Sequence, residues 1–461
     1  DADVVFKDGG ITYTDASSMN KTVVSDFTAF DTTFWLTAKG NGTAANPFII
    51  ETANQFAAVA INNLVYDSNI ATSLDISRFT IDANGYLDTA GVAFKVADNI
   101  KAFNMNNTES TVDFSGDMTA EQVENALADA PVKSGLRWEH SLGDAKAPVF
   151  KGTFNGNGVT VYGLKGYTGI NSGLFPKVGG ADIRNLTVKN CYFNGDRVGV
   201  LIGNNSTAAG LVVRNCAIYN NVAVCTRKND CDVYGGVIVG FVYSGVDTNW
   251  QNGTINLYDS LIYGNDVKHS KTVAAHNNEY NFKYGLFGNS SNKQGAVVTN
   301  CIVLDSAPYS LWHGYNAFYN STYATVYTNT LDMTITNTGY KSDGAVKVEN
   351  VTETVVNSDG SVTQKFNVFE NGTDKNINYE RKHDAGTLIK VEASDVQGSA
   401  AKSKLSALDW DKWTVSANGY ATPKIYNIRE YSAGSAWTGD VALTYSGGDG
   451  SSSSPYMVNL S

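Results

Sequence analysis

Hydrophobic and polar residues follow one repeated pattern from about residue 150 onwards. Each repeat has a glycine, two or three apolar residues and a second glycine, then a polar turn and a short strand. The strand ends in Asn or Asp followed by Cys or Ser, and another apolar strand follows. The repeats begin at Gly173, Gly199, Gly235 and Gly285. Short strands that recur without helices between them favour a parallel β-helix over alternating strands and helices.

The matched positions of these repeats are Cys191, Cys216, Ser260 and Cys301, which lie 25, 44 and 41 residues apart. We interpret 25 residues as one coil and the longer intervals as coils with polar loop insertions. Successive coils lie about 4.8 Å apart, so Cys191 and Cys216 are predicted to be vertical neighbours. The four positions would then form a buried ladder of small side chains. The Asn or Asp before each of them is expected to turn the chain.

Two helices are predicted before the repeats. Thr52 and Gln55 have the spacing of a capping box, and apolar residues recur on one face of the stretch that follows. Thr119 and Gln122 repeat that spacing before a second amphipathic stretch. Both helices are expected to lie at the periphery of a β body.

After the repeats, the chain alternates around a Ser-Asp-Gly turn, which predicts a projecting β-hairpin over residues 346–370. A third helix is expected over residues 399–408. We divide the chain into a cap and lead-in region (1–147), a parallel β-helix core with loop insertions (148–345), a region of hairpin, helix and closing strands (346–430), and a C-terminal extension (431–461).

The last fifteen residues repeat the pattern of residues 40–50. Both stretches have a glycine-rich run, a small polar spacer, a proline, an aromatic residue and two apolar residues. The earlier copy continues into a predicted helix that would cover its strand, whereas the later copy has three more residues. We therefore predict that the tail strand, Pro455, Tyr456, Met457 and Val458, is an assembly strand that pairs with another subunit.

Composition and charge exclude some classes of function. The formal net charge is −11, and no basic run is interleaved with aromatic residues, so nucleic-acid binding is not expected. No stretch has the roughly 18 to 20 apolar residues of a membrane helix. The first residues do not resemble a signal peptide, which fits a mature form after removal of one.

The five cysteines contain no CxxC pair and have no histidine at zinc-ligand spacing, so no metal site or cofactor is indicated. Calcium remains an open alternative. Cys225 and Cys231 enclose a hydrophilic loop that a disulfide could close. Two free thiols explain the same pair equally well in a reducing compartment.

Several stretches resemble, in their order along the chain, secreted surface proteins with GLUG-type repeats, especially those of Bacteroidota. These stretches are "NPFIIETANQFAAVA", "FKGTFNGNGVTVYGL", "SGLFPKVGGADIRNLTVKNC" and "DWDKWTVSANGYATPKI", and the resemblance extends from about residue 36 to residue 428. It implies a right-handed parallel β-helix related to the pectate-lyase superfamily. It implies little about activity, because the family is assigned mostly to adhesins and surface proteins.

Polysaccharide lyases and hydrolases also use parallel β-helices, and they need carboxylates or basic residues that converge from adjacent coils. The best candidates in the repeats do not recur at positions that would stack, and Asp196 with Arg197 is expected to form an exposed turn and ion pair. These candidates are Asp182, Asp196, Arg197, Arg214, Asp230 and Asp232. The sequence therefore predicts no catalytic residues and no enzyme, with a polysaccharide lyase or hydrolase as the weakest alternative.

Aromatic residues in the insertions are the candidate ligand-binding residues. Trp250 and the group Tyr309, Trp312 and Tyr315 could stack on sugar rings, or could cover an exposed end of the solenoid. We expect an extracellular or cell-surface structural protein, a fibre or filament subunit whose copies join through terminal strands. The alternative is an adhesin that binds a glycan or another cell-surface ligand. The expected partner is a second copy of the chain, with no membrane span.

Overall fold

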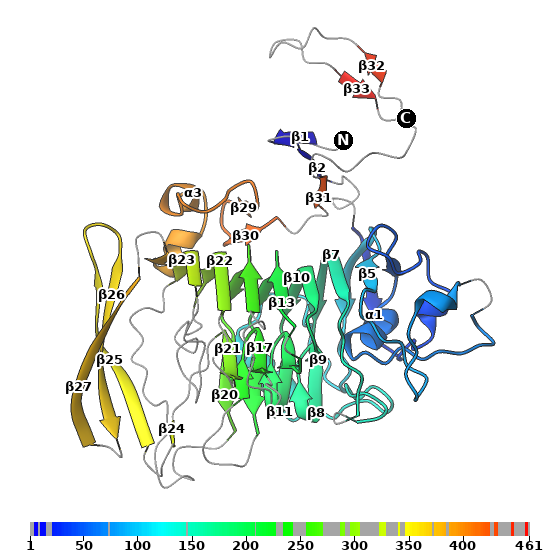
Figure 1. The fold of residues 1–461 in the computed structure, drawn as a ribbon, viewed down its shortest axis with the longest axis horizontal. Helices are drawn as coiled ribbons and strands as arrows, with labels where there is room; N and C mark the ends of the chain where they lie inside the picture. The colour runs from blue at the N-terminus through cyan, green and yellow to red at the C-terminus, as the bar shows by residue number, and fades with distance from the viewer. Residues whose placement is uncertain are drawn as a thin grey trace. The chain divides into compact units, whose positions relative to one another are not determined.

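The structure is a computed structural model in which β-strands predominate and helices are few and short (Figure 1). It describes residues 4–7, 10–14, 21–71, 74–143, 146–207, 209–226, 234–242, 255–270, 286–290, 296–304, 322–328, 340–341, 346–370, 373–383, 387–424, 428–431, 444–446 and 457–459.

The chain divides into two compact units, residues 17–426 and residues 1–16 with 427–461. The second unit contains a three-stranded antiparallel sheet of β1 (Val4–Lys7), β2 (Gly10–Thr14) and β31 (Ile428–Tyr431). It also contains the antiparallel pair β32 (Thr444–Ser446) and β33 (Met457–Asn459). The predicted assembly residues Met457 and Val458 therefore pair with a strand of their own chain.

The first unit is built on three parallel sheets to which the chain returns in turn. In one circuit the chain passes from the large sheet to a second and then a third sheet, through β10 (Asp182–Lys189), β11 (Tyr192–Gly199) and β12 (Ile202–Asn205). The preceding circuit is β7 (Thr153–Tyr162), β8 (Lys165–Ser172) and β9 (Phe175–Val178). Each strand pairs in parallel with its equivalent in the neighbouring circuit, an arrangement consistent with a β-helix.

The later circuits continue the same three sheets, and Figure 1 shows the successive strands of the large sheet side by side. The large sheet continues through β13 (Leu211–Arg214), β14 (Ala217–Tyr219), β18 (Ile255–Tyr258), β19 (Leu261–Tyr263), β22 (Ala296–Val303), β23 (Thr322–Thr328) and β28 (Leu388–Lys390). The second sheet adds β15 (Val222–Cys225), β16 (Tyr234–Gly236) and β20 (Asp266–His269), and the third adds β17 (Val239–Val242) and β21 (Phe287–Ser290).

The register corrects the predicted coil length. Ile183 pairs with Val213, so one uninterrupted circuit takes 30 residues rather than 25. Thr187 pairs with Ala217, which places Cys216 next to Leu186. Cys191 lies at the following corner, where its backbone N–H donates to the side chain of Asn221. The prediction that Cys191 and Cys216 are vertical neighbours is therefore wrong, because Asn-Cys occurs at two different corners of the circuit.

The corners of the circuit, which lie between strands or within the long strands β10 and β22, need a left-handed backbone, and asparagine tolerates it better than most residues. Asn185, Asn215, Asp259 and Asn300 have φ values of 57°, 54°, 48° and 54° at one corner of successive circuits. Asn190 has a φ value of 53° at the next corner. The polar residue before each Cys or Ser of the repeats thus turns the chain.

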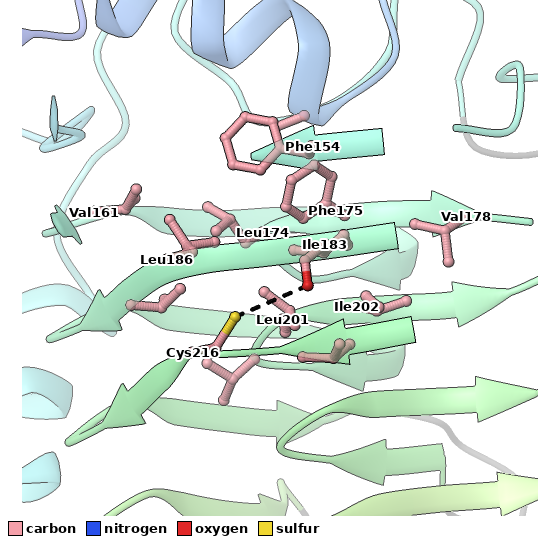
Figure 2. Close-up of a cluster of buried hydrophobic side chains, with 14 of the residues drawn as sticks. Phe154, Val161, Leu174, Phe175, Val178, Ile183, Leu186, Leu201, Ile202 and Cys216 are labelled. Carbon is pink, nitrogen blue, oxygen red and sulfur yellow. Dashed lines mark hydrogen bonds between the residues drawn. The ribbon is translucent and has the colours of Figure 1, made fainter. Parts of the chain in front are cut away.

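The interior is an apolar core to which all three sheets contribute. Figure 2 shows Phe154 and Ile183 from the large sheet pointing toward Phe175 and Ile202 from the third sheet. All four side chains are fully buried. Burial at alternate positions of β10 and β13 follows the two-residue period of a strand with one face in the core.

Helices and short strands precede the first circuit. Helix α1 (Ala53–Ala60) is capped by Thr52, whose side chain accepts from the Gln55 N–H, and helix α2 (Ala120–Leu127) has a complete capping box. The Phe56 ring stacks on Phe103 at 5.2 Å between centroids, which fixes α1 against the start of the stack. The strands here are β3 (Val23–Asp26), β4 (Phe48–Ile50), β5 (Ala93–Val96) and β6 (Ile100–Asn104), and the 3-10 turns are η2 (Phe34–Leu36) and η3 (Ile76–Arg78).

The predicted hairpin is part of a larger antiparallel sheet. Its two strands are β25 (Val346–Val356) and β26 (Val362–Glu370), and they join β24 (Tyr340–Lys341) and β27 (Thr373–His383). The predicted third helix is shorter, because α3 covers only Ala401–Lys404. It follows the 3-10 turn η6 (Ala393–Val396) and precedes the antiparallel pair β29 (Trp413–Val415) and β30 (Ala421–Pro423).

Candidate functional site

One outward-facing position of the large sheet carries a polar side chain in six successive strands. Parallel pairing places each of these residues next to its equivalent in the neighbouring circuit, and each is only partly buried, whereas the residue before it points into the core. We call this set the polar row: Lys95, Asn155, Arg184, Arg214, Tyr258 and Thr299.

Two guanidinium groups of the polar row share one carboxylate. Asp182 Oδ2 lies 2.7 Å from Arg214 Nη2 and 3.4 Å from Arg184 Nη2. Asp182 and Arg184 are on β10, and Arg214 is on the neighbouring strand β13. The trio therefore carries one net positive charge on a chain whose formal net charge is −11. The side chains are 23%, 33% and 42% exposed for Asp182, Arg184 and Arg214, so solvent reaches all three.

The surroundings of Arg184 make its charged form less stable than it would be in water. Partial burial lowers the pKa of Arg184, Asp182 opposes that shift, and the adjacent Arg214 adds to it. The Nε atoms of Arg184 and Arg214 are buried and make no hydrogen bond among the described residues. Two like charges on adjacent strands repel, so a second anion beside them is electrostatically favourable.

A groove of about 420 Å³ opens at the end of the polar row that Lys95 occupies. Lys95 Nζ lies 2.8 Å from Asp98 Oδ1, and the same carboxylate accepts from Asn157 Nδ2 at 2.7 Å. Partial burial opposes ionisation of Asp98, but its bonds to Lys95 and Asn157 prevail and lower its pKa. The groove is lined by Lys39, Ile49, Glu51, Lys95, Val96, Ala97, Asp98 and Asn99.

A ladder of side-chain amides holds the row in register. Asn185 Nδ2 donates to Asn155 Oδ1 at 2.8 Å, and Asn215 Nδ2 donates to Asn185 Oδ1 at 2.6 Å. Further along, Asn300 Nδ2 donates to Asp259 Oδ1 at 2.6 Å. These corner residues follow Arg184, Arg214, Tyr258 and Thr299 directly in the sequence, so the bonds between them help to hold these four residues of the polar row in place.

Three tyrosines form a separate stack on the outer side of the large sheet. The rings of Tyr219 and Tyr263 are 4.6 Å apart and nearly parallel, and Tyr420 stacks on Tyr263 at 4.5 Å. Burial raises the pKa of Tyr219 to about 12, and the nearby Asp117 adds to the shift. Since the faces of these rings cover one another, the stack serves packing and leaves little ring surface for a ligand.

Most of the predicted ligand-binding and assembly residues lie outside the described residues. They are Trp250, Tyr309, Trp312, Tyr315, Pro455 and Tyr456. Asp230 and Asp232 also lie outside them. Asp196 and Arg197 belong to strand β11 rather than to an exposed turn, and Arg197 lies 4.5 Å from the ring centroid of Phe241.

The sequence predicts that Asp182 and Arg214 do not stack, and Asp182 indeed pairs with Val212 whereas Arg214 pairs with Arg184. The two side chains nevertheless meet diagonally across β10 and β13. Lys95, Asn155 and Arg184 are not among the site residues that the sequence predicts. The sequence does contain a signal for the polar row, which is the position next to a corner. Arg184, Arg214, Tyr258 and Thr299 each directly precede a corner Asn or Asp.

The predicted ladder residues are all buried, and three of them share one corner. Pairing on both sides of the corner places Cys216, Ser260 and Cys301 next to one another. Burial raises the pKa of Cys191 and Cys216 to about 12, which makes both thiols poor nucleophiles.

Cys225 is buried and its thiol donates to the Asp196 carbonyl at 3.3 Å. Cys231 lies outside the described residues, so its disulfide with Cys225 stays a prediction.

Comparisons with known proteins place the chain in no named family. No family model and no curated protein matches it. A crystal structure described as that of a "putative immunoglobulin A1 protease" from Bacteroides ovatus is similar over 84% of this chain and 95% of that chain. The two chains are 12% identical and the TM-score is 0.35. The resemblance to GLUG-repeat proteins stays a prediction.

Within the described ranges, no helix is long and apolar enough to cross a membrane. The same residues contain no group of three or more His, Cys, Asp or Glu side chains that could hold a metal ion.

Proposed function

We propose that this chain is an extracellular right-handed parallel β-helix protein that binds an acidic polysaccharide along the polar row without cleaving it. The observation that carries the proposal is the placement of Arg184 and Arg214 on adjacent strands, where both guanidinium groups are partly exposed and share the single carboxylate of Asp182.

Arginine suits this role because its planar group binds a carboxylate or sulfate through two parallel hydrogen bonds. Successive strands place polar-row residues about 4.8 Å apart along the stack. A polymer that lies along the stack would meet a hydrogen-bonding group at every circuit, with Asn155 on one side of the arginines and Tyr258 on the other. The groove beside Lys95 would admit a further acidic or hydroxylated unit.

Two parts of the proposal rest on other support. The extracellular location comes from the resemblance to secreted surface proteins. The right-handed sense follows the general rule that connections between parallel strands of one sheet are right-handed in nearly all proteins.

The test is a binding measurement with an acidic polysaccharide and its carboxyl-reduced neutral counterpart. We expect the wild type to bind the acidic polymer, and Arg214→Gln to weaken that binding about tenfold, because a partly exposed charged hydrogen bond contributes about 1.4 kcal/mol. Lys404→Gln is the matched control, since Lys404 is an exposed cation on α3. It makes the same change in net charge and should bind as the wild type does.

Two results would contradict the proposal. Equal binding of the acidic and neutral polymers would refute recognition of acidic groups. Release of unsaturated or reducing ends from the acidic polymer would show turnover, and would favour the lyase or hydrolase alternative over a binding protein.

A further inference from the structure

The segment of residues 136–143 folds against the start of the stack through buried aromatic and polar contacts. Trp138 is fully buried, and its Nε1–H donates to the Gly173 carbonyl at 3.1 Å. Its ring meets Phe27 edge-on at 5.8 Å between centroids. The segment therefore covers core residues at the beginning of the parallel sheets.

His140 is the buried titratable group of this segment, and its hydrogen bond defines its protonation state. His140 is only 4% exposed to solvent. Its Nδ1 atom accepts from the Leu142 N–H at 3.0 Å, and the Gly143 N–H donates to the His140 carbonyl at 2.8 Å. An Nδ1 atom that accepts a hydrogen bond carries no proton, so the ring is neutral with its proton on Nε2.

Polar groups from other elements surround this ring. Tyr86 lies 4.8 Å from His140 between ring centroids, and its hydroxyl is 2.6 Å from Ser141 Oγ. Ser141 Oγ also donates to Asn63 Oδ1 at 3.3 Å, just beyond the end of α1. Among the described residues, His140 Nε2 and both amide atoms of the buried Asn62 make no hydrogen bond.

We propose that His140 is an acid-sensitive latch, which holds residues 136–143 against the end of α1 while the ring is neutral and releases them when the ring is protonated. Protonation adds a hydrogen to Nδ1, where it would face the Leu142 N–H. Two donors then point at each other in a site without bulk water, and the turn from His140 to Gly143 loses its side-chain bond.

The charges that face the ring do not offset this cost. Burial is the largest influence and lowers the pKa of His140 to about 4. The backbone of Asn62 and the carboxylate of Asp82 favour the protonated ring, and Lys177 on β9 opposes it. Because the pKa in the folded state lies below the ordinary value of about 6.5, the contribution to stability is complete above that value and is lost as the pH falls toward 4.

Hydrogen exchange on the full chain tests the latch. From the two pKa values, the equilibrium for opening residues 138–143 should rise about twentyfold between pH 7 and pH 5, after correction for the intrinsic exchange rate. His140→Asn is the matched variant, because a short amide oxygen can also accept from the N–H two residues later but cannot be protonated. We expect less than a twofold change for this variant. An equal pH response in both proteins would overturn the proposal.

A second measurement keeps the proposal testable if that variant does not fold. The imidazole nitrogens of ¹⁵N-histidine-labelled wild type report tautomer and pKa directly, and His140 is assigned by replacing the other four histidines one at a time. We expect a proton on Nε2 and a midpoint near pH 4. A His140 midpoint near the ordinary value, or a proton on Nδ1 at neutral pH, would refute the latch.

Discussion

Ser260 lies between Cys216 and Cys301 in a buried column at one corner of the circuits. Replacing Ser260 by alanine removes the one hydroxyl donor of this column. Ser260 Oγ donates to the Tyr258 carbonyl at 2.7 Å and accepts from the Cys216 N–H at 3.2 Å. Cys216 and Cys301 make the equivalent donor contact, since each thiol lies 3.2 Å from the carbonyl two residues earlier. A Cys or Ser at this position thus stabilises the left-handed corner by donating a hydrogen bond to the carbonyl two residues earlier in the chain.

The magnitude follows from these two bonds. Ser260→Ala deletes one hydrogen bond worth about 1 kcal/mol and leaves the buried Cys216 N–H without its acceptor, which costs about 1 to 2 kcal/mol more. We expect the free energy of unfolding to fall by about 2 to 3 kcal/mol. Ser260→Cys keeps a donor at the corner, as in the circuits on either side, and should cost less than about 1 kcal/mol.

Urea denaturation followed by circular dichroism measures the difference, with the slope of the transition compared between variants to check that the same structure unfolds. An alanine variant as stable as the cysteine variant would refute the reasoning. The column would then be held by apolar packing alone, and the hydrogen bonds at the corner would contribute nothing measurable.

Two further predictions concern a glycine in strand β17 and the tail. At Gly240 an added Cβ would lie 2.3 Å from the Val198 carbonyl oxygen, so Gly240→Ala should cost about 3 kcal/mol or more in thermal or urea unfolding. Gly85→Ala, where φ is +84° but nothing lies within 4 Å of the added Cβ, should cost only about 1 kcal/mol, and equal losses would contradict this contrast. Deleting residues 451–461 should leave the mass in light scattering unchanged, because Met457–Asn459 pair with Thr444–Ser446 of the same chain. A fall from an oligomer to a monomer would instead support strand exchange between subunits.

Local signals in the sequence predicted local structure well. The capping spacing of Thr119 and Gln122 corresponds to a complete capping box, and the alternation around Asp359 corresponds to the antiparallel pair β25 and β26. Parallel sheets also follow from the repeat, because short apolar strands without helices between them have few other ways to bury one face.

Long-range register could not be predicted, because two corners of each circuit use the same residues. Asn190-Cys191 and Asn215-Cys216 match in sequence, but the first precedes a strand of the second sheet and the second lies within a strand pair of the large sheet. The strand pairings distinguish them, since Thr187 pairs with Ala217 and Tyr192 pairs with Val222. The 25 residues from Cys191 to Cys216 therefore separate two different corners and do not give the length of a coil.

Intervals along the sequence conceal the polar row. Counted from the corner asparagine, Arg184, Arg214, Tyr258 and Thr299 occupy one position, although 30, 44 and 41 residues separate them. Insertions leave the circuit elsewhere, so they change the sequence interval without moving the residue before the corner. A left-handed corner residue thus does two things: it turns the chain into the next strand, and its amide ladder sets the height of the side chain that precedes it. Because Asn215 Nδ2 donates to Asn185 Oδ1 at the corner that directly follows Arg214, we expect a substitution at Asn215 that removes this bond also to displace Arg214.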